Sequence, residues 1–363
     1  MKKRVFALLI LLLLFVSGCG SSEGGEEHEQ SELSGRVVYV YNYGDYIDPE
    51  CIDMFEEETG ITVVYDVFDT NEEMYPVVSS GAVRYDVVCP SEYMVQKMMA
   101  NDMLAEINYD NVPNFEYISQ TCRDIAEQYD PGNRYSVPYN WGTVGILYNT
   151  NVYPSGSITS WSDLWKDEYF DDVMMMDSLR DIYMVPLKIL GLSANTTDPD
   201  ELRAATDLLI EQKPLVYKYA TDAIRDFLLS ESANIGMIYS GEVGYCLEEV
   251  DFLEYVLPEE GSNVWVDSWV IPKNCRDKEA AEAWINFFCR PDIGLMTFDY
   301  IYYSTPNDGT LELMREDPEY EEILENPAIV PSDDIISRCE VYRYLGPEAD
   351  RLYNEYWKEF KAY

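Results

Sequence analysis

The chain has 363 residues, and 68 acidic side chains against 25 basic ones give it a formal net charge of −43. A field of that sign repels nucleic acid and anionic lipid surfaces and attracts cations, so we expect no nucleic-acid partner. The only histidine is His28, which precedes the predicted folded body. A Ser-His-Asp or Cys-His catalytic group and a histidine-bound metal site are therefore excluded from that body.

The first eighteen residues have the features of a signal peptide. A basic start, KKR, is followed by twelve apolar residues at 5–16, fewer than the roughly 20 that span a bilayer as a helix. The segment ends in VSGC, which resembles the bacterial lipobox, so residues 1–18 are predicted to be removed and Cys19 to be lipidated. A buried strand and a plain secretory signal are the alternatives. The mature protein is expected outside the cytoplasm, lipid-anchored to the bacterial cell membrane, on the periplasmic side if the envelope has two membranes.

A polar stretch at 19–35, rich in Gly, Ser and Glu, is predicted to be a flexible tether. Without residues 1–18 the chain keeps 22 basic and 68 acidic residues, a net charge of −46. About 328 residues follow from Arg36, more than one hydrophobic core usually serves, so two domains are expected.

Seven cysteines follow Cys19, and no two of them are closer than fourteen positions. The spacing therefore lacks the CxxC pattern of redox and zinc sites. Because seven is odd, at least one thiol stays free. Most of the cysteines are predicted to be small buried apolar residues, and the sequence does not decide whether one disulfide forms. We expect no cofactor and no metal.

The first part of the body alternates strands and helices. Proline after Asp48 predicts a helix start and Gly60 its end, Asn71 is predicted to cap a second helix that runs to about Ser80, and a third helix is expected at 93–100. This βαβαβα order implies a parallel sheet with helices on both faces. The strands are predicted at 36–41, 61–68 and 85–89.

A similar pattern recurs after Tyr139. Helices are expected at 180–190 and 201–212, among others. Two α/β units in one chain suggest two lobes with a cleft between them, and ligands of open α/β sheets bind beyond the carboxyl ends of strands. The strands of this second unit are predicted at 144–148, 173–176, 214–217, 234–239 and 252–256.

Aromatic and acidic residues gather in the loops expected after Tyr41, Cys89, Met176, Tyr239 and Val264, where Arg180 is the only basic residue. A buried ammonium must be paired and hydrogen-bonded, and aromatic faces add about 0.5–2 kcal/mol each. The loops therefore suit an organic cation such as a diamine or polyamine. A sugar remains an alternative on composition, and with 31 tyrosines in the chain some of these aromatics occur there by chance.

Eight segments extend these observations: YVYNYGDYIDPECIDMFEEETGITVVYDVFDTNEEMY, YDVVCPSEYMVQKM, YSVPYNWGTVGILYNT, ITSWSDLW, NIGMIYSGEVGY, VWVDSWVIP, AAEAWINFFCRPD and YYSTPN. In this order, from Val37 to the C-terminus, they resemble the spermidine/putrescine-binding proteins of ABC importers. The resemblance implies a two-lobed periplasmic-binding-protein fold of type II, each lobe a mainly parallel sheet flanked by helices. It places the N-terminal lobe at 36–142 plus 267–312, the C-terminal lobe at 143–266 plus 313–363, and hinge crossings near 141–145 and 264–268.

The same resemblance carries over ligand-binding roles. Tyr43 and Tyr239 stand where the family usually has a tryptophan, Asp181 where it has a glutamate, and Asp267 is the expected central ammonium clamp. The full expected set is Tyr43, Asp45, Tyr46, Ser91, Tyr93, Asp181, Tyr239, Glu242, Trp265, Asp267 and Tyr303.

Three departures bear on specificity. Ser178 stands where spermidine-preferring members carry a carboxylate, Glu242 where putrescine-preferring members carry an aspartate, and Arg343, in a looser alignment, where a glutamine reaches spermidine. Together they favour putrescine slightly. The alternative is that Arg343 points to solvent and Glu242 replaces Ser178 across the cleft.

The resemblance implies a monomeric binding protein without catalysis, which captures a polyamine, closes over it and delivers it to an ABC permease while its lipid holds it at the membrane. The alternatives are an extracytoplasmic glycosidase that uses Asp181 and Asp267, a binding protein for another organic cation or a sugar, and a lipoprotein sensor or adhesin.

Overall fold

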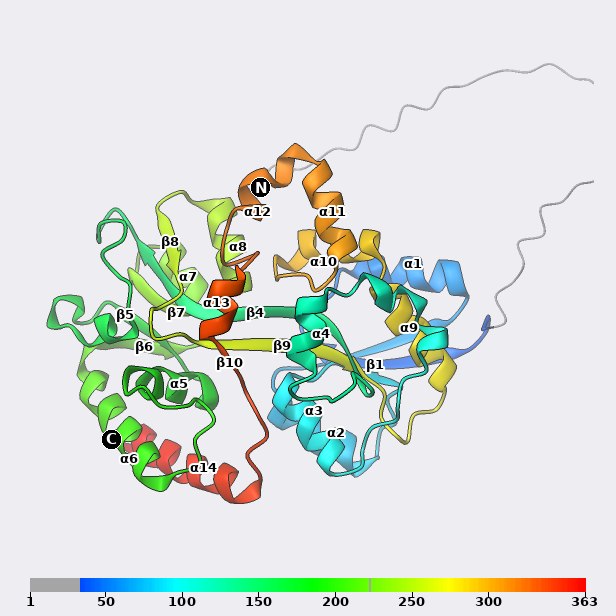
Figure 1. Ribbon diagram of the computed structural model, residues 1–363, viewed down its shortest axis with the longest axis horizontal. Helices are drawn as coiled ribbons and strands as arrows, with labels where there is room; N and C mark the ends of the chain where they lie inside the picture. The colour runs from blue at the N-terminus through cyan, green and yellow to red at the C-terminus, as the bar shows by residue number, and fades with distance from the viewer. Residues whose placement is uncertain (1–32, 222) are drawn as a thin grey trace, which may run out of the picture.

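One long strand, β4 (Ser136–Asn149), runs through both halves of the molecule, and every one of its residues is buried. The computed structural model describes residues 33–221 and 223–363, and within them two α/β lobes lie at the two ends of this strand (Figure 1). The predicted two-lobed α/β fold is confirmed.

The first lobe is built on the parallel strands β2, β1 and β3. Its first helix begins as predicted, with Asp48 accepting from the amide of Glu50, and ends at Gly60, whose φ of 70° is left-handed and suits glycine. The second helix is capped by Thr70, which corrects the predicted cap at Asn71. The elements are β1 Val37–Tyr43, α1 Pro49–Thr59, β2 Thr62–Phe68, α2 Asn71–Ser80, β3 Val87–Val88, α3 Glu92–Ala100 and α4 Gln120–Ala126, with 3-10 turns at Tyr109–Asn111 and Pro113–Tyr117.

The centre of the fold is an antiparallel pair, β4 with β9 (Asn263–Val270). Val264 was predicted to end a strand, but β9 continues to Val270 because its carboxyl half pairs with β4 and β3. The first half of β4, up to Thr143, pairs with β9, and the second half, from Val144, pairs with β7 and β8. The partner change lies inside the segment 141–145 that was expected to cross between the lobes.

The second lobe repeats the arrangement with the parallel strands β7, β5 and β6. The strand predicted at 214–217 begins only at Val216, since Pro214 has no amide hydrogen for a ladder and lies in a 3-10 turn. The elements are β5 Val173–Met176, α5 Leu179–Ile189, α6 Pro199–Gln212, β6 Val216–Ala220, α7 Ala223–Leu229, β7 Ile235–Tyr239, α8 Ser240–Glu249 and β8 Leu253–Val256, with 3-10 turns at Trp161–Trp165, Asp167–Tyr169 and Lys213–Leu215.

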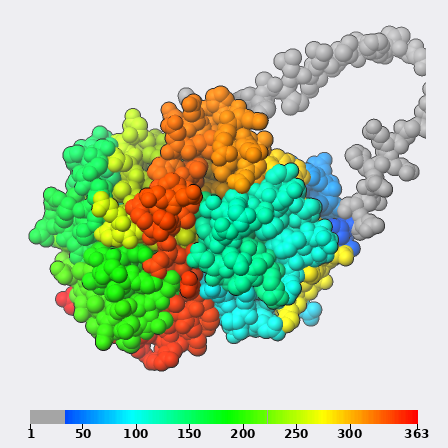
Figure 2. All heavy atoms as spheres, in the orientation of Figure 1, coloured from blue at the N-terminus to red at the C-terminus, as the bar shows by residue number. Residues whose placement is uncertain are grey.

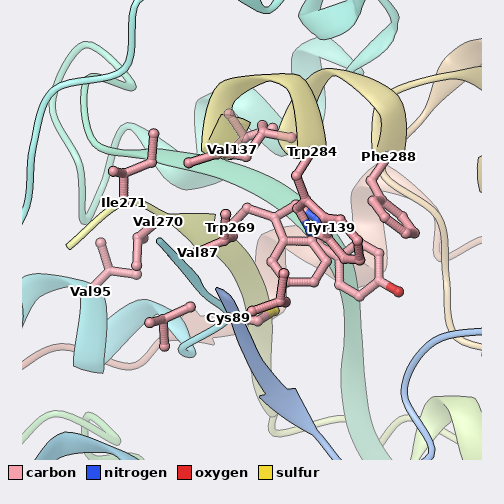
Figure 3. Packing of buried hydrophobic residues seen from close by; sticks show 14 of the residues in the cluster. Val87, Cys89, Val95, Val137, Tyr139, Trp269, Val270, Ile271, Trp284 and Phe288 are labelled. Carbon is pink, nitrogen blue, oxygen red and sulfur yellow. The ribbon is translucent and has the colours of Figure 1, made fainter. Parts of the chain in front are cut away.

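Each lobe has its own hydrophobic core. In the first, Trp269 lies 4.4 Å from Tyr139 and 5.9 Å from Trp284 between ring centroids, and Figure 3 shows these rings among the buried hydrophobic side chains. The second core gathers residues from Val144 to Phe360. The seven cysteines of the described residues are all free, and five of them are buried, as expected for small apolar side chains.

The C-terminal part of the chain crosses back over the boundary between the lobes. Figure 2 shows residues coloured orange to red filling the seam between the green and cyan halves. A small core of Phe298, Met314 and Ile329 supports this segment. None of the helices in the described residues is long and apolar enough to cross a membrane. The elements are α9 Lys278–Phe288, α10 Pro291–Ile301, α11 Asp308–Glu316, α12 Glu321–Leu324, α13 Asp333–Arg338, β10 Glu340–Val341 and α14 Pro347–Ala362, with a 3-10 turn at Pro318–Tyr320.

Candidate ligand-binding site

Five aromatic rings form a continuous row across the boundary between the lobes. The centroid distances are 5.4 Å from Tyr43 to Tyr46, 5.5 Å from Tyr46 to Tyr303, 5.4 Å from Tyr303 to Trp265 and 6.2 Å from Trp265 to Tyr239. Adjacent rings are close to perpendicular, an arrangement that stabilises each pair by about 0.5–1.5 kcal/mol. The row joins residues far apart in sequence into one aromatic surface.

The middle ring is placed by an unusual backbone turn. Helix α10 ends at Ile301, its C-cap residue Tyr302 has a left-handed φ of 59°, and the next residue, Tyr303, packs against both cores. Its ring lies so close to Gly241 at the start of α8 that a Cβ there would come within 2.2 Å of it. Glycine at 241 is therefore required for this position of Tyr303.

Asp267 in β9 is a buried carboxylate beside Tyr46 of the row. Its Oδ2 accepts from the hydroxyl of Tyr46 at 2.7 Å, and its Oδ1 accepts from the hydroxyl of Ser91 at 2.6 Å. Burial raises its pKa to about 6, although both hydrogen bonds act in the opposite direction. A nearby cation would stabilise the ionised form of this carboxyl.

Ser91 links Asp267 to the aromatic row. It is the N-cap residue of α3, yet its hydroxyl caps no helix amide and bonds Asp267 instead. The same hydroxyl lies 3.0 Å from the phenol of Tyr43 and accepts from the side-chain Nδ2 of Asn71 at 3.0 Å. The loops after β1 and β3 and the start of α2 therefore converge on one carboxylate.

A second carboxylate, Asp181 in the first turn of α5, lies at the other end of the row. Its Oδ2 accepts from Ser178 at 2.5 Å and from Tyr239 at 2.8 Å, and its Oδ1 accepts from Tyr342 at 3.1 Å. Three hydroxyl donors thus hold this buried group. Ser178 serves Asp181 as a hydrogen-bond donor.

The third carboxylate, Glu242 in α8, differs from the other two. Its Oε1 accepts from the hydroxyl of Tyr303 at 3.2 Å, while its Oε2 lies 2.8 Å from Nη1 of Arg225 in α7. Glu242 thus contacts the aromatic row like the other two carboxylates, but its charge is already paired with a guanidinium.

Other expected residues lie apart from these contacts. Asp45 is exposed, with a left-handed φ of 49°, and Tyr93 packs against both cores while its hydroxyl donates to Glu72 at 3.0 Å. Arg343 is exposed, and its amide donates to Asn195 at 2.8 Å. Arg180 stacks on Tyr342 at 4.6 Å.

The two lobes also touch beside this site. The amide of Tyr344 donates to Oε1 of Gln96 in α3 at 2.8 Å, and Nζ of Lys97 lies 3.7 Å from Asp350 in α14. Lys97 also lies over the ring of Tyr344, 5.7 Å from its centroid. These contacts join α3 of the first lobe to the chain that enters α14 of the second.

Four residues that hold the site together were not among the expected ligand-binding residues: Tyr342, Asn71, Arg225 and Glu92. Glu92 is fully buried, with Oε2 accepting from the amide of Val266 at 3.0 Å and Oε1 without a hydrogen-bond partner among the described residues, and burial raises its pKa to about 8. Glu92 directly follows Ser91 in the loop after the strand predicted at 85–89, so the strand-end rule could have found it. Asn71 likewise comes three residues after the strand predicted at 61–68, whereas Arg225 and Tyr342 directly follow no predicted strand. Among the described residues no group of His, Cys, Asp and Glu side chains forms a metal site.

The geometry supports reversible binding of an organic cation: buried carboxylates provide charge, and the rings provide apolar and cation–π surface. Residues 50–328 match the model of the bacterial extracellular solute-binding protein family, and the chain belongs to that family.

Named relatives agree with this placement. The spermidine/putrescine-binding periplasmic protein of Salmonella typhimurium is 35% identical over 329 residues, 90% of this chain and 92% of that protein. The crystal structure of the substrate-binding protein PotD of a Streptococcus pneumoniae spermidine/putrescine ABC transporter is 37% identical, with a TM-score of 0.79 over 90% of this chain and 99% of that one. A putative spermidine/putrescine ABC transporter structure from Listeria monocytogenes is 36% identical, with a TM-score of 0.82 over the same shares.

Proposed function

We propose that this protein captures polyamines, putrescine or spermidine, between its lobes and delivers them to an ABC permease. The observation that carries the proposal is the row of five rings in which Tyr46 and Tyr239 each donate to a buried carboxylate, Asp267 and Asp181. An aliphatic amine satisfies both parts, because its ammonium groups pair with carboxylates and its methylenes cover rings, worth roughly 0.8 kcal/mol per CH₂ buried. The names of the relatives above support the same ligand class.

The site proposed for this ligand is the expected set, with Asp267 as the central clamp and Tyr342 added as a positioning residue for Asp181. We also propose that the lobes consist of 36–142 plus 267–312 and of 143–266 plus 313–363. Closure then follows from the greater affinity of the amine for the closed form.

Isothermal titration of the mature chain with putrescine and spermidine tests the proposal. Binding in the micromolar range or tighter is expected for at least one amine, and none for a neutral hexose or for 4-aminobutanoate, whose carboxylate would face Asp181 or Asp267. No heat with either polyamine at millimolar concentration would exclude the function. Recovery of a bound oligosaccharide as cleaved product would instead support the glycosidase alternative.

We further propose that the protein is a monomer anchored outside the cytoplasm through lipidated Cys19. The lipobox-like VSGC motif supports anchoring. In a bacterial host, the wild-type chain is expected in the membrane fraction and Cys19→Ala in the precursor or soluble fraction. An unchanged distribution would contradict lipid anchoring without affecting the proposed ligand.

A further inference from the structure

The ion pair between Arg225 and Glu242 changes the charge that the site offers to a ligand. Nη1 of Arg225 lies 2.8 Å from Oε2 of Glu242, whose side chain is 15% exposed. The other oxygen of Glu242 accepts from Tyr303, the central ring of the aromatic row. The guanidinium therefore pairs with a carboxylate that contacts the aromatic row.

Arg225 is held in place by more than this pair. Its guanidinium carbon lies over the ring of Tyr245, 4.4 Å from the centroid, and its Nε lies 3.7 Å from Asp226. Tyr245 and Glu242 both lie on α8, and Arg225 lies on α7, which packs against it. The cation is thus fixed by the packing of two helices.

The other two carboxylates have a different environment. Within residues 33–221 and 223–363, no lysine or arginine forms an ion pair with Asp267 or Asp181, which are held by hydroxyl donors. Each of them therefore keeps its charge available for a cationic group of the ligand. Of these three carboxylates, Glu242 is the one that pairs with a basic side chain in the described part of the chain.

We propose that Arg225 neutralises Glu242, leaves Asp267 and Asp181 as the two buried carboxylates that pair with ammonium groups, and so selects a diamine over a triamine. This inference rests on the proposed function. A desolvated ammonium that lacks a carboxylate of its own is costly, so the third charge of a triamine finds no partner. Near Glu242 it also meets the positive charge of Arg225.

The test measures putrescine and spermidine binding to the mature chain by titration calorimetry at one ionic strength. Wild type is expected to bind putrescine more tightly than spermidine. Arg225→Gln frees the charge of Glu242, so the affinity for spermidine should rise about tenfold relative to that for putrescine. Arg225→Lys keeps the charge and should keep the wild-type ratio.

Two further variants separate charge from folding. In Arg225→Gln with Glu242→Gln the gain in spermidine affinity should be lost, because the released carboxylate is gone. Arg225→Met keeps the stem on the ring of Tyr245 and should repeat the effect of Arg225→Gln if that variant folds poorly. A polyamine preference that is unchanged in both Arg225→Gln and Arg225→Met, or a wild type that prefers spermidine, overturns the inference alone. A wild type that binds neither amine overturns the proposed function.

Discussion

The phenol of Tyr46 donates to Oδ2 of Asp267 across 221 positions of sequence, at a distance of 2.7 Å. Tyr46 is itself fixed, because its carbonyl accepts from the hydroxyl of Tyr139 at 2.8 Å. A buried carboxylate with a fixed donor keeps its orientation before any ligand arrives, and this reduces the ordering cost of binding.

Replacing Asp267 with Asn should weaken amine binding severely while leaving the ligand-free protein intact. Loss of the charge leaves a buried ammonium unpaired, so the affinity should fall by about a hundredfold or more. The ligand-free melting temperature should equal or exceed that of wild type at pH 7, because burying the ionised group costs stability. Calorimetric titration and thermal melts measure the two effects.

Asp86→Asn is the matched control for that variant. Asp86 is fully buried and accepts from the amides of Tyr39, at 2.9 Å, and Asp277, at 2.9 Å. Its replacement should lower the melting temperature by several degrees and leave amine affinity close to wild type. The reverse pattern, a binding loss at Asp86 and none at Asp267, would contradict the assigned site.

Amine binding should weaken as the pH falls through about 6. The pKa of Asp267 is raised from an ordinary value of 3.8 to about 6 by burial, so below pH 6 the ligand-free carboxyl is protonated and cannot pair with an ammonium. The affinity should fall about tenfold for each pH unit well below 6. Titrations between pH 4.5 and 8 measure this, and Asp267→Asn should remove the dependence.

Glu92 should make the folded protein less stable at high pH. Burial raises its pKa from an ordinary value of 4.5 to about 8, so the folded state holds a proton that the unfolded state has lost between these values, and stability falls as the pH rises through this window. Glu92→Gln should therefore raise the melting temperature more at pH 8.5 than at pH 5, by about 5 °C or more. An equal change at both pH values would show that Glu92 does not titrate in this range.

Gly241→Ala should disrupt the aromatic row. The new methyl group would lie 2.2 Å from the ring of Tyr303, so the ring must move away from Tyr46 and Trp265. Amine affinity should drop tenfold or more, roughly the loss of one well-placed ring contact. Gly44→Ala, directly after Tyr43 at the end of β1 but with open space around its Cβ, should bind almost normally, and an equal loss in both variants would refute the steric explanation.

Lys97→Ala should weaken amine binding two- to fivefold, the range expected for a partly exposed ion pair. Its contacts with Asp350 and Tyr344 join the two lobes, so their loss favours separation of the lobes and faster ligand release. Stopped-flow dissociation rates measure this. Lys361→Ala breaks an ion pair with Asp177 inside the second lobe and should leave the rates unchanged.

Much of the fold was predictable because local signals agreed with it. Proline after Asp48 and glycine at 60 bounded α1 correctly, and the strand-end rule directed attention to the segments that hold Ser91 and Tyr46. These signals are local, so a short stretch of sequence contains them.

What was missed depends on distant contacts. The first half of β4 contains Pro138 and Gly142, which argue against a strand, and it is held there by pairing with β9 more than a hundred residues later. Likewise, Tyr342 reaches Asp181 from 161 positions away, and Arg225 reaches Glu242 from a neighbouring helix. Periodicity within one segment carries no record of such partners.

The position of β9 between β3 and β4 also governs when the first lobe can form. As the chain is made, β1 to β4 emerge by Asn149, but the strand that joins β3 to β4 is not complete until Val270. An amino-terminal fragment that ends before Asn263 therefore lacks the middle of its own sheet, and long-range pairing of this kind is slow to form. The sheet of the first lobe is therefore complete only after most of the chain has been synthesised.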